Sequence, residues 1–231
     1  MYYSTADEME KLDRLAVETG LNILQMMELA GWHMTSVFGE LEIEKSKKIT
    51  VVAGKGNKGG DGFAAARHLI NHGYDVSIVL ASGDLKSDPQ HHLDLLDEMD
   101  TTVLLYSQAP DMSKEKIENS DVVIDSLIGY HLDGAPKNEF KDLVNIINDS
   151  ESVVISYDLP TGLNPTTGHC FSPCIQADAT LTLALPKRGL KEATQKVGRL
   201  FLGDIGIPDM LYNKIKPGSR PDFSTQGLIE L

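Results

Sequence analysis

The sequence predicts a single α/β domain, residues 1–231, in which helices cover both faces of a mostly parallel β-sheet. Three observations support this prediction. Apolar, β-branched runs alternate with helical patterns between residues 49 and 160, an arrangement typical of parallel sheets. The 231 residues include 41% hydrophobic side chains, which is enough for a full core. No internal repeat, low-complexity run or linker divides the chain.

Two helices are expected before the first strand. Thr5 and Glu8 have the spacing of a capping box, and Gly20 is expected to end the first helix. The second helix begins at Asn22 in a similar way and carries an apolar face. Trp32 on this helix either anchors an interface or packs in the core. Because the pair lies outside a minimal βαβ unit, we expect it to form an edge layer or a dimer surface.

A glycine-rich stretch follows the first expected strand, residues 49–53. Residues 54–62 contain five glycines, and residues 63–70 continue with helical spacing up to a stop at Gly73. Strand, glycine loop and helix N-terminus together bring backbone N–H groups close to an anion. The stretch therefore predicts a phosphate site, with a plain turn as the alternative.

The remaining elements follow in alternation. Further strands are expected at residues 75–80, 102–106, 121–129, 152–162, 179–185 and 200–202, and helices at residues 88–99, 114–119 and 136–147 and near residues 210–211. His91 and His92 are expected to be solvated. The last two strands lack a clear helix between them, so we expect an antiparallel extension there.

The composition limits the classes of partner. The net charge of −13 argues against general binding to nucleic acid or to anionic membranes, because both need a basic surface. No run approaches the roughly 18 apolar residues of a membrane span, and the first residues lack a signal-peptide layout. We therefore expect a cytoplasmic protein. Cys170 and Cys174 suit free thiols in a reducing compartment, with a local disulfide or a shared metal as the alternative.

Polar side chains follow three of the expected strands. The residues concerned are Asn57, Lys58 and Asp61 after the first strand, Asp125 at the fourth, and Asp158 and Thr161 at the fifth. Ligands of open α/β sheets bind beyond the carboxyl ends of the strands, so these groups should converge on one crevice. Three carboxylates there would attract a cation or share protons. The alternatives are a favourable charge on a helix dipole for Asp61 and loop capping for the other two aspartates.

These motifs resemble the YjeF N-terminal domain family, the NAD(P)H-hydrate epimerases. The resemblance covers nearly the whole chain and rests on six stretches, which are Met27–Gly31, Gly54–Gly62, Asp125–Gly129, Asp158–Asn164, Ala177–Lys187 and Gly203–Pro208. The glycine loop and the Asp-x-Pro-x-Gly strand end, in this order, are the most specific.

The resemblance implies a three-layer αβα Rossmann-like sandwich, a homodimer through the N-terminal helices, and interconversion of the R and S forms of NADHX and NADPHX. A separate NAD(P)H-hydrate dehydratase would then act downstream. Epimerisation by loss and return of water needs a carboxylate to handle the proton, and we expect Asp158 to be this catalytic residue. Substrate binding is implied for Asn57, Lys58, Gly59, Gly60, Asp61, Gly129, Tyr130, His131, Leu132, Asp133, Gly134, Ala135 and Asp158.

The family's potassium ligands correspond to position 58, Asp125 and Thr161. Position 58 is lysine here instead of asparagine, and an ammonium cannot ligate a cation. Lys58 either pairs with Asp125 and replaces potassium or points into solvent and weakens the ion site. Tyr130 and His131 replace smaller residues of the family pattern and put a titratable imidazole beside the site.

Two other functions stay open on the sequence alone. One is a non-catalytic nucleotide-binding or dimerisation module of the same fold. The other is a diverged enzyme that acts on another nucleotide or an ADP-ribose-like ligand. The retained Asp61, Asp125 and Asp158 favour the epimerase, whereas Lys58 and the Tyr130–His131 pair favour divergence.

Overall fold

The computed structural model describes residues 1–99, 101–132 and 134–231. Within these residues the chain forms an eight-stranded sheet in the order β3-β2-β1-β4-β5-β6-β7-β8. The pairs from β3 to β7 are parallel, and β8 pairs antiparallel with β7. The strands are β1 (Lys48–Ala53), β2 (Asp75–Leu80), β3 (Thr102–Leu105), β4 (Val122–Ser126), β5 (Val153–Tyr157), β6 (Ala179–Leu183), β7 (Arg199–Gly203) and β8 (Leu228–Glu230).

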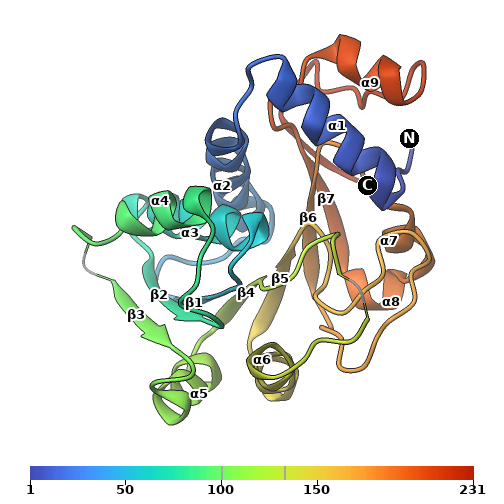
Figure 1. The fold of residues 1–231 in the computed structure, drawn as a ribbon. Helices are drawn as coiled ribbons and strands as arrows, with labels where there is room; N and C mark the ends of the chain where they lie inside the picture. The colour runs from blue at the N-terminus through green and yellow to red at the C-terminus, as the bar shows by residue number, and fades with distance from the viewer. Residues whose placement is uncertain (100, 133) are drawn as a thin grey trace.

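Helices cover both faces of this sheet, which confirms the three-layer α/β fold (Figure 1). On one face lie α1 (Ala6–Glu18), α2 (Ile23–Glu40), α3 (Asn57–Asn71), α4 (Ser87–Asp94) and α9 (Asp209–Ile215). On the other lie α5 (Pro110–Glu118) and α6 (Glu139–Asp149). The short helices α7 (Arg188–Glu192) and α8 (Thr194–Val197) connect β6 to β7. Among the described residues no helix is both long and apolar enough to cross a membrane.

The strands are apolar on both faces because each face packs on helices. In β1, Ile49 and Val51 join a core with Phe63 of α3, whereas Val52 joins a second core with Leu143 of α6. Successive side chains of a strand point to opposite faces, so a doubly covered strand needs apolar residues at every position. The continuous apolar runs in the sequence are the direct result.

The two N-terminal capping boxes form as expected. The Glu8 N–H donates to Thr5 Oγ1 at 3.2 Å and the Gln25 N–H donates to Asn22 Oδ1 at 3.0 Å. Each pair begins its helix at the predicted residue. Trp32 is 49% exposed on α2, so the alternative in which it packs in the core is wrong.

The expected antiparallel extension at β6 and β7 is wrong, because these two strands run parallel. The short helices α7 and α8 supply the crossover that a parallel pair requires. Neither helix is long enough to show a clear helical periodicity in the sequence. The antiparallel partner of β7 is β8, which the sequence did not indicate.

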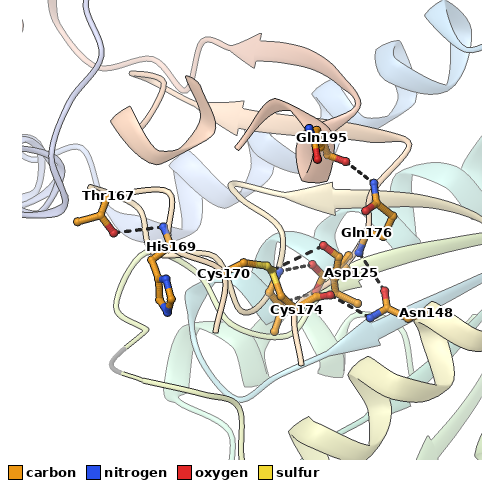
Figure 2. The surroundings of a disulfide bond; sticks show 10 residues. Asp125, Asn148, Thr167, His169, Cys170, Cys174, Gln176 and Gln195 are labelled. Atoms are coloured by element: carbon orange, nitrogen blue, oxygen red, sulfur yellow. Dashed lines mark hydrogen bonds between the residues drawn. A yellow bond between two sulfur atoms is a disulfide. The ribbon is translucent and has the colours of Figure 1, made fainter. Parts of the chain in front are cut away.

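Two local predictions are also wrong. His92 is 3% exposed, because α4 packs this side chain toward α3 instead of into solvent. Cys170 and Cys174 form a disulfide across a turn that brings their Cα atoms to 5.9 Å, so they are not free thiols. Figure 2 shows this loop beside Asn148 of α6, whose side chain donates to the Cys174 carbonyl and accepts from the Gln176 N–H.

The strand order reverses between β1 and β4. To one side of this point the chain proceeds through β2 and β3, and to the other through β5, β6 and β7. Connections leave a reversal point on opposite faces of the sheet and open a crevice at the carboxyl ends of the two strands. This is where a ligand of the fold is expected.

Candidate active site

A cavity of about 850 Å³ opens at that crevice. Its floor is made by the segments that follow β1 and β4, and α1 and α2 supply its upper wall. The charged and aromatic groups that border it are Glu10, Asp13, Arg14, Glu18, Lys55, Lys58, Asp61, Lys86, Tyr130, His131, Phe140, Asp158 and Lys187. The polar strand ends therefore converge as the sequence predicted, at the carboxyl ends of β1 and β4.

Asp158 follows β5 and forms an ion pair with Lys187. The backbone of Asp158 has φ of 61°, in the left-handed region, and the Leu159 N–H closes a tight turn on the Tyr157 carbonyl at 2.6 Å. Non-glycine residues adopt this conformation at a cost, and such positions cluster at functional sites. Lys187 is 1% exposed and also donates to Thr182 Oγ1 and the Leu183 carbonyl, so the pair has a fixed geometry.

Lys58 lies in the first turn of α3, and its side chain reaches beneath the cavity. Its Nζ lies within hydrogen-bond distance of four oxygens, which are Asp125 Oδ2 at 3.0 Å, Thr161 Oγ1 at 3.0 Å, the Leu159 carbonyl at 2.9 Å and the Ile128 carbonyl at 3.2 Å. The side chain is 4% exposed, so the alternative in which Lys58 points into solvent is wrong. Burial lowers the pKa of the Lys58 ammonium, and the negative charge of Asp125 opposes that shift.

The potassium expected from the resemblance does not fit beside Lys58. The oxygens of Asp125 and Thr161 that correspond to the ligands of the ion already accept hydrogen bonds from the ammonium. A second cation would have to share these oxygens with a positive charge that lies about 3 Å from them. Position 58, moreover, supplies a donor where a ligand oxygen is needed.

Asp61 on α3 and Asp13 on α1 also border the cavity, and the pKa of each of these carboxyl groups is raised. Burial, with the negative charges of Asp158 and Asp13, raises the pKa of Asp61 well above its ordinary value. Burial raises the pKa of Asp13 to about 6, against a hydrogen bond from the Tyr130 hydroxyl that favours its ionised form. That hydrogen bond joins Tyr130 Oη to Asp13 Oδ2 at 2.5 Å.

The glycines of the loop serve close packing more than ligand approach. A Cβ on Gly59 would lie 2.0 Å from the Gly54 carbonyl oxygen, and one on Gly60 would lie 2.7 Å from the Met27 side chain. Both glycines sit behind the cavity wall and let α3 pack on β1 and α2. Gly56 differs, because it borders the cavity and a Cβ there would meet no atom within 4 Å.

The N-terminus of α3 opens into the cavity at Gly56 and Asn57. Gly56 is the N-cap and gives no side-chain hydrogen bond to the first turn, and Lys55 and Lys86 border the same end. Free N–H groups with a partial positive charge and two ammonium groups suit a phosphate. The phosphate site predicted from the glycine stretch would therefore lie at the part of the cavity wall that the α3 N-terminus forms.

The predicted site residues fall into three groups. The residues that border the cavity are Asn57, Lys58, Asp61, Gly129, Tyr130, His131 and Asp158. Asp125 and Thr161 lie beneath it around the Lys58 ammonium. Five described residues do not border it, which are Gly59, Gly60, Leu132, Gly134 and Ala135, and Asp133 lies outside the described residues.

The sequence reasoning missed Asp13 and Lys187. Lys187 lies in the motif Leu185–Lys187, so its place after a strand was a usable signal. Asp13 is one of several charged positions on an amphipathic helix, and only the packing of α1 over the cavity distinguishes it.

Known proteins resemble this chain over most of its length. The chain is 37% identical over 214 residues to a protein named NAD(P)H-hydrate epimerase from Dehalogenimonas lykanthroporepellens. The match covers 91% of this chain and 84% of that relative. It is 36% identical over 225 residues to the bifunctional NAD(P)H-hydrate repair enzyme Nnr of Moorella thermoacetica, of which it spans 42%. A relative from Plasmodium knowlesi, also named NAD(P)H-hydrate epimerase, is 33% identical over 201 residues, with 85% of this chain and 66% of the relative covered.

The fold has a solved counterpart. The crystal structure of yeast ynu0, YNL200c, superposes with a TM-score of 0.89 at 23% identity, over the full length of both chains. A sequence model described as YjeF-related protein N-terminus matches residues 23–189, which contain the glycine loop and both aspartate strand ends. Because that model matches most of the chain and a relative named for the family's activity is 37% identical over 91% of it, the protein belongs to the YjeF-related N-terminal family.

Proposed function

We propose that this chain is an NAD(P)H-hydrate epimerase, an isomerase that interconverts the R and S forms of NADHX and NADPHX. The names of relatives at 37% and 33% identity support the activity. The observation that carries the proposal is the position of Asp158, at the cavity wall, in a constrained turn and paired with Lys187.

The size of the cavity and the charged groups that border it suit a dinucleotide. Its volume of about 850 Å³ is within the range of ligand pockets. The pyrophosphate of the substrate would meet the α3 N-terminus and Lys55. The hydrated nicotinamide ring would then lie beside Asp158 and Asp61, which border the same cavity.

Epimerisation at the ring carbon that bears nitrogen and hydroxyl needs loss and return of water. A carboxylic acid protonates the hydroxyl, the C–O bond breaks, and the nitrogen lone pair forms an iminium. Water then adds to the opposite face and gives its surplus proton to a carboxylate. Asp158, which forms an ion pair with Lys187, suits the base, and the raised pKa of Asp61 suits the proton donor.

The test is turnover of purified R-NADHX, followed by chromatography of the two epimers. We expect the wild type to reach the equilibrium mixture, and Asp158→Asn to lose at least a hundredfold in rate because general acid–base catalysis contributes about that much. Asp111→Asn, an exposed aspartate on the opposite face of the sheet, is the matched control and should keep the wild-type rate.

A folded wild type without turnover would refute the epimerase. If ADP-ribose or NAD still bound in the cavity, the result would favour the diverged-ligand or binding-module alternatives, with Tyr130 and His131 as the residues that changed the site.

We further propose a homodimer through α2. Trp32 is 49% exposed and Leu29 is 37% exposed on this helix, and the Trp32 ring lies edge-on to His68 of α3 and to His72, which follows α3. Sedimentation of the wild type and Trp32→Ser tests this assignment. A dimer that the substitution does not weaken would place the interface elsewhere.

The downstream partner is proposed as a separate NAD(P)H-hydrate dehydratase. The Moorella relative, of which this chain spans 42%, is named a bifunctional NAD(P)H-hydrate repair enzyme, and that name supports a second repair activity that works together with the epimerase. A cytoplasmic location stays a prediction, and the Cys170–Cys174 disulfide argues against the reducing compartment inferred from free thiols.

A further inference from the structure

Four oxygens surround the Lys58 ammonium beneath the cavity floor. They come from three segments, which are the end of β4, the loop that follows it and the loop after β5. Two are backbone carbonyls, one is a hydroxyl and one is a carboxylate oxygen, at 2.9 to 3.2 Å from Nζ. Such a mixed shell of oxygens, with carbonyls in place of water, is how proteins bind a bare monovalent cation.

The oxygen shell is held in place by bonds that do not involve the lysine. Asp125 accepts from the Thr161 N–H at 2.9 Å and from Ser156 Oγ at 2.8 Å. The Thr161 hydroxyl lies 2.6 Å from Asp125 Oδ1, and the Ile128 N–H donates to Thr161 Oγ1 at 3.1 Å. The loops after β4 and β5 are thus locked to each other, and the shell should persist when the ammonium is removed.

The shell holds one acceptor more than an ammonium can use. A lysine carries three N–H groups, whereas four oxygens converge on Nζ. The number and variety of the oxygens therefore match a spherical ion better than a tetrahedral donor. One positive charge is nevertheless required, because Asp125 is fully buried and an unpaired buried carboxylate is strongly unfavourable.

We infer that Lys58 is a built-in monovalent cation, so that this protein neither needs nor binds potassium at this place. The ammonium neutralises Asp125 and ties α3 to the loops after β4 and β5, and those loops carry Gly129 and Asp158 at the cavity wall. Replacing Lys58 with a short residue that has an amide oxygen would leave an oxygen cage with a negative charge. That cage takes potassium, so the substitution creates a dependence that the wild type lacks.

Thermal unfolding in potassium chloride and in choline chloride at equal ionic strength tests the inference without any assumption about activity. We expect the wild-type midpoint to be the same in both salts. Lys58→Asn should unfold at a lower temperature in choline chloride and recover with potassium, by roughly 3 to 5 °C for each tenfold rise above the dissociation constant.

Two further variants separate the cage from general effects. Lys58→Met fills the same space without a charge, so its midpoint should fall and potassium should not restore it. Lys141→Asn, an exposed lysine of α6, should behave as the wild type in both salts. Crystals soaked in thallium, a heavy monovalent cation, should show an anomalous peak between Asp125 and Thr161 only in Lys58→Asn.

The inference would be overturned by a saturable rise of the wild-type midpoint with potassium, or by thallium in the wild-type cage. These two measurements decide the question even where Lys58→Asn fails to fold. A test by enzyme activity rests on the proposed function. The epimerisation rate of the wild type should change less than twofold between the two salts. The rate of Lys58→Asn should rise at least tenfold with potassium. A wild type that is inactive in both salts refutes the epimerase but leaves the unfolding result to decide the cage.

Discussion

Replacing Asp13 with asparagine is expected to stabilise the protein at neutral pH and to leave its stability unchanged in acid. Asp13 lies on α1 at the cavity wall, where Glu10 and Asp158 add negative charge and Lys187 adds positive charge. Burial is the main reason that its pKa rises to about 6. Asparagine keeps an oxygen that can accept the Tyr130 hydroxyl bond and removes the ionisation.

The sign follows from proton binding in the two states. The folded protein holds a proton on Asp13 up to about pH 6, whereas the unfolded chain releases it near pH 3.8, the ordinary pKa of an aspartate. Between these values the folded state binds more protons, so the wild type loses stability as pH rises. A difference of about two pKa units corresponds to about 3 kcal/mol. This is an upper limit, because one side of Asp13 faces the cavity.

Urea unfolding followed by far-ultraviolet circular dichroism between pH 3.5 and pH 8 measures the difference between wild type and Asp13→Asn. We expect no difference near pH 3.5 and a gain by the variant that grows to at most about 3 kcal/mol above pH 6. Asp7→Asn, an exposed aspartate on the same helix, is the control and should show no such growth. A difference that is constant with pH would refute the reasoning, because it would mean that Asp13 has the same pKa folded and unfolded.

The remaining predictions concern stability. Gly31→Ala should lower the free energy of unfolding by about 1–3 kcal/mol, because its Cβ would lie 2.7 Å from Ala64 of the packed helix. The control Gly39→Ala, on the same helix with nothing within 4 Å, should raise it by about 0.5–1 kcal/mol in the same urea titration, and a loss at both positions would show a general helix effect. Replacing both Cys170 and Cys174 with alanine removes the disulfide and should lower the free energy of unfolding by about 2 kcal/mol. Thiol titration of the non-reduced native protein should find no free thiol. Lys187→Met should cost about 3–5 kcal/mol because it leaves a buried carboxylate without its partner, and an unchanged unfolding midpoint would contradict that ion pair.

Local patterns in the sequence determined most of the elements. The β-branched runs became β1, β2 and β4 close to the predicted bounds, because a strand covered on both faces needs apolar residues throughout. The capping boxes at Thr5 and Asn22 placed the first two helices correctly, since a cap is a contact between residues three apart. The alternation of strand and helix was sufficient to place the polar strand ends at one edge of the sheet.

Contacts between distant segments were not in those patterns. The direction of β7 depended on two helices too short to show a periodic signal. The disulfide depended on the turn that brings Cys170 to Cys174, and the pairing of Asp158 with Lys187 on how β5 and β6 end side by side.

The sequence by itself determined the layer order of this protein, the aspartates of its crevice and the unusual lysine at position 58. Only the tertiary structure decided what that lysine does, because its four oxygens come from residues that lie 67 to 103 positions away along the chain. It likewise decided that α1 brings Asp13 to Tyr130, 117 residues apart. Burial and Coulomb interactions act through space, so the charge state of such groups follows from how the layers pack and not from which residues are neighbours in sequence.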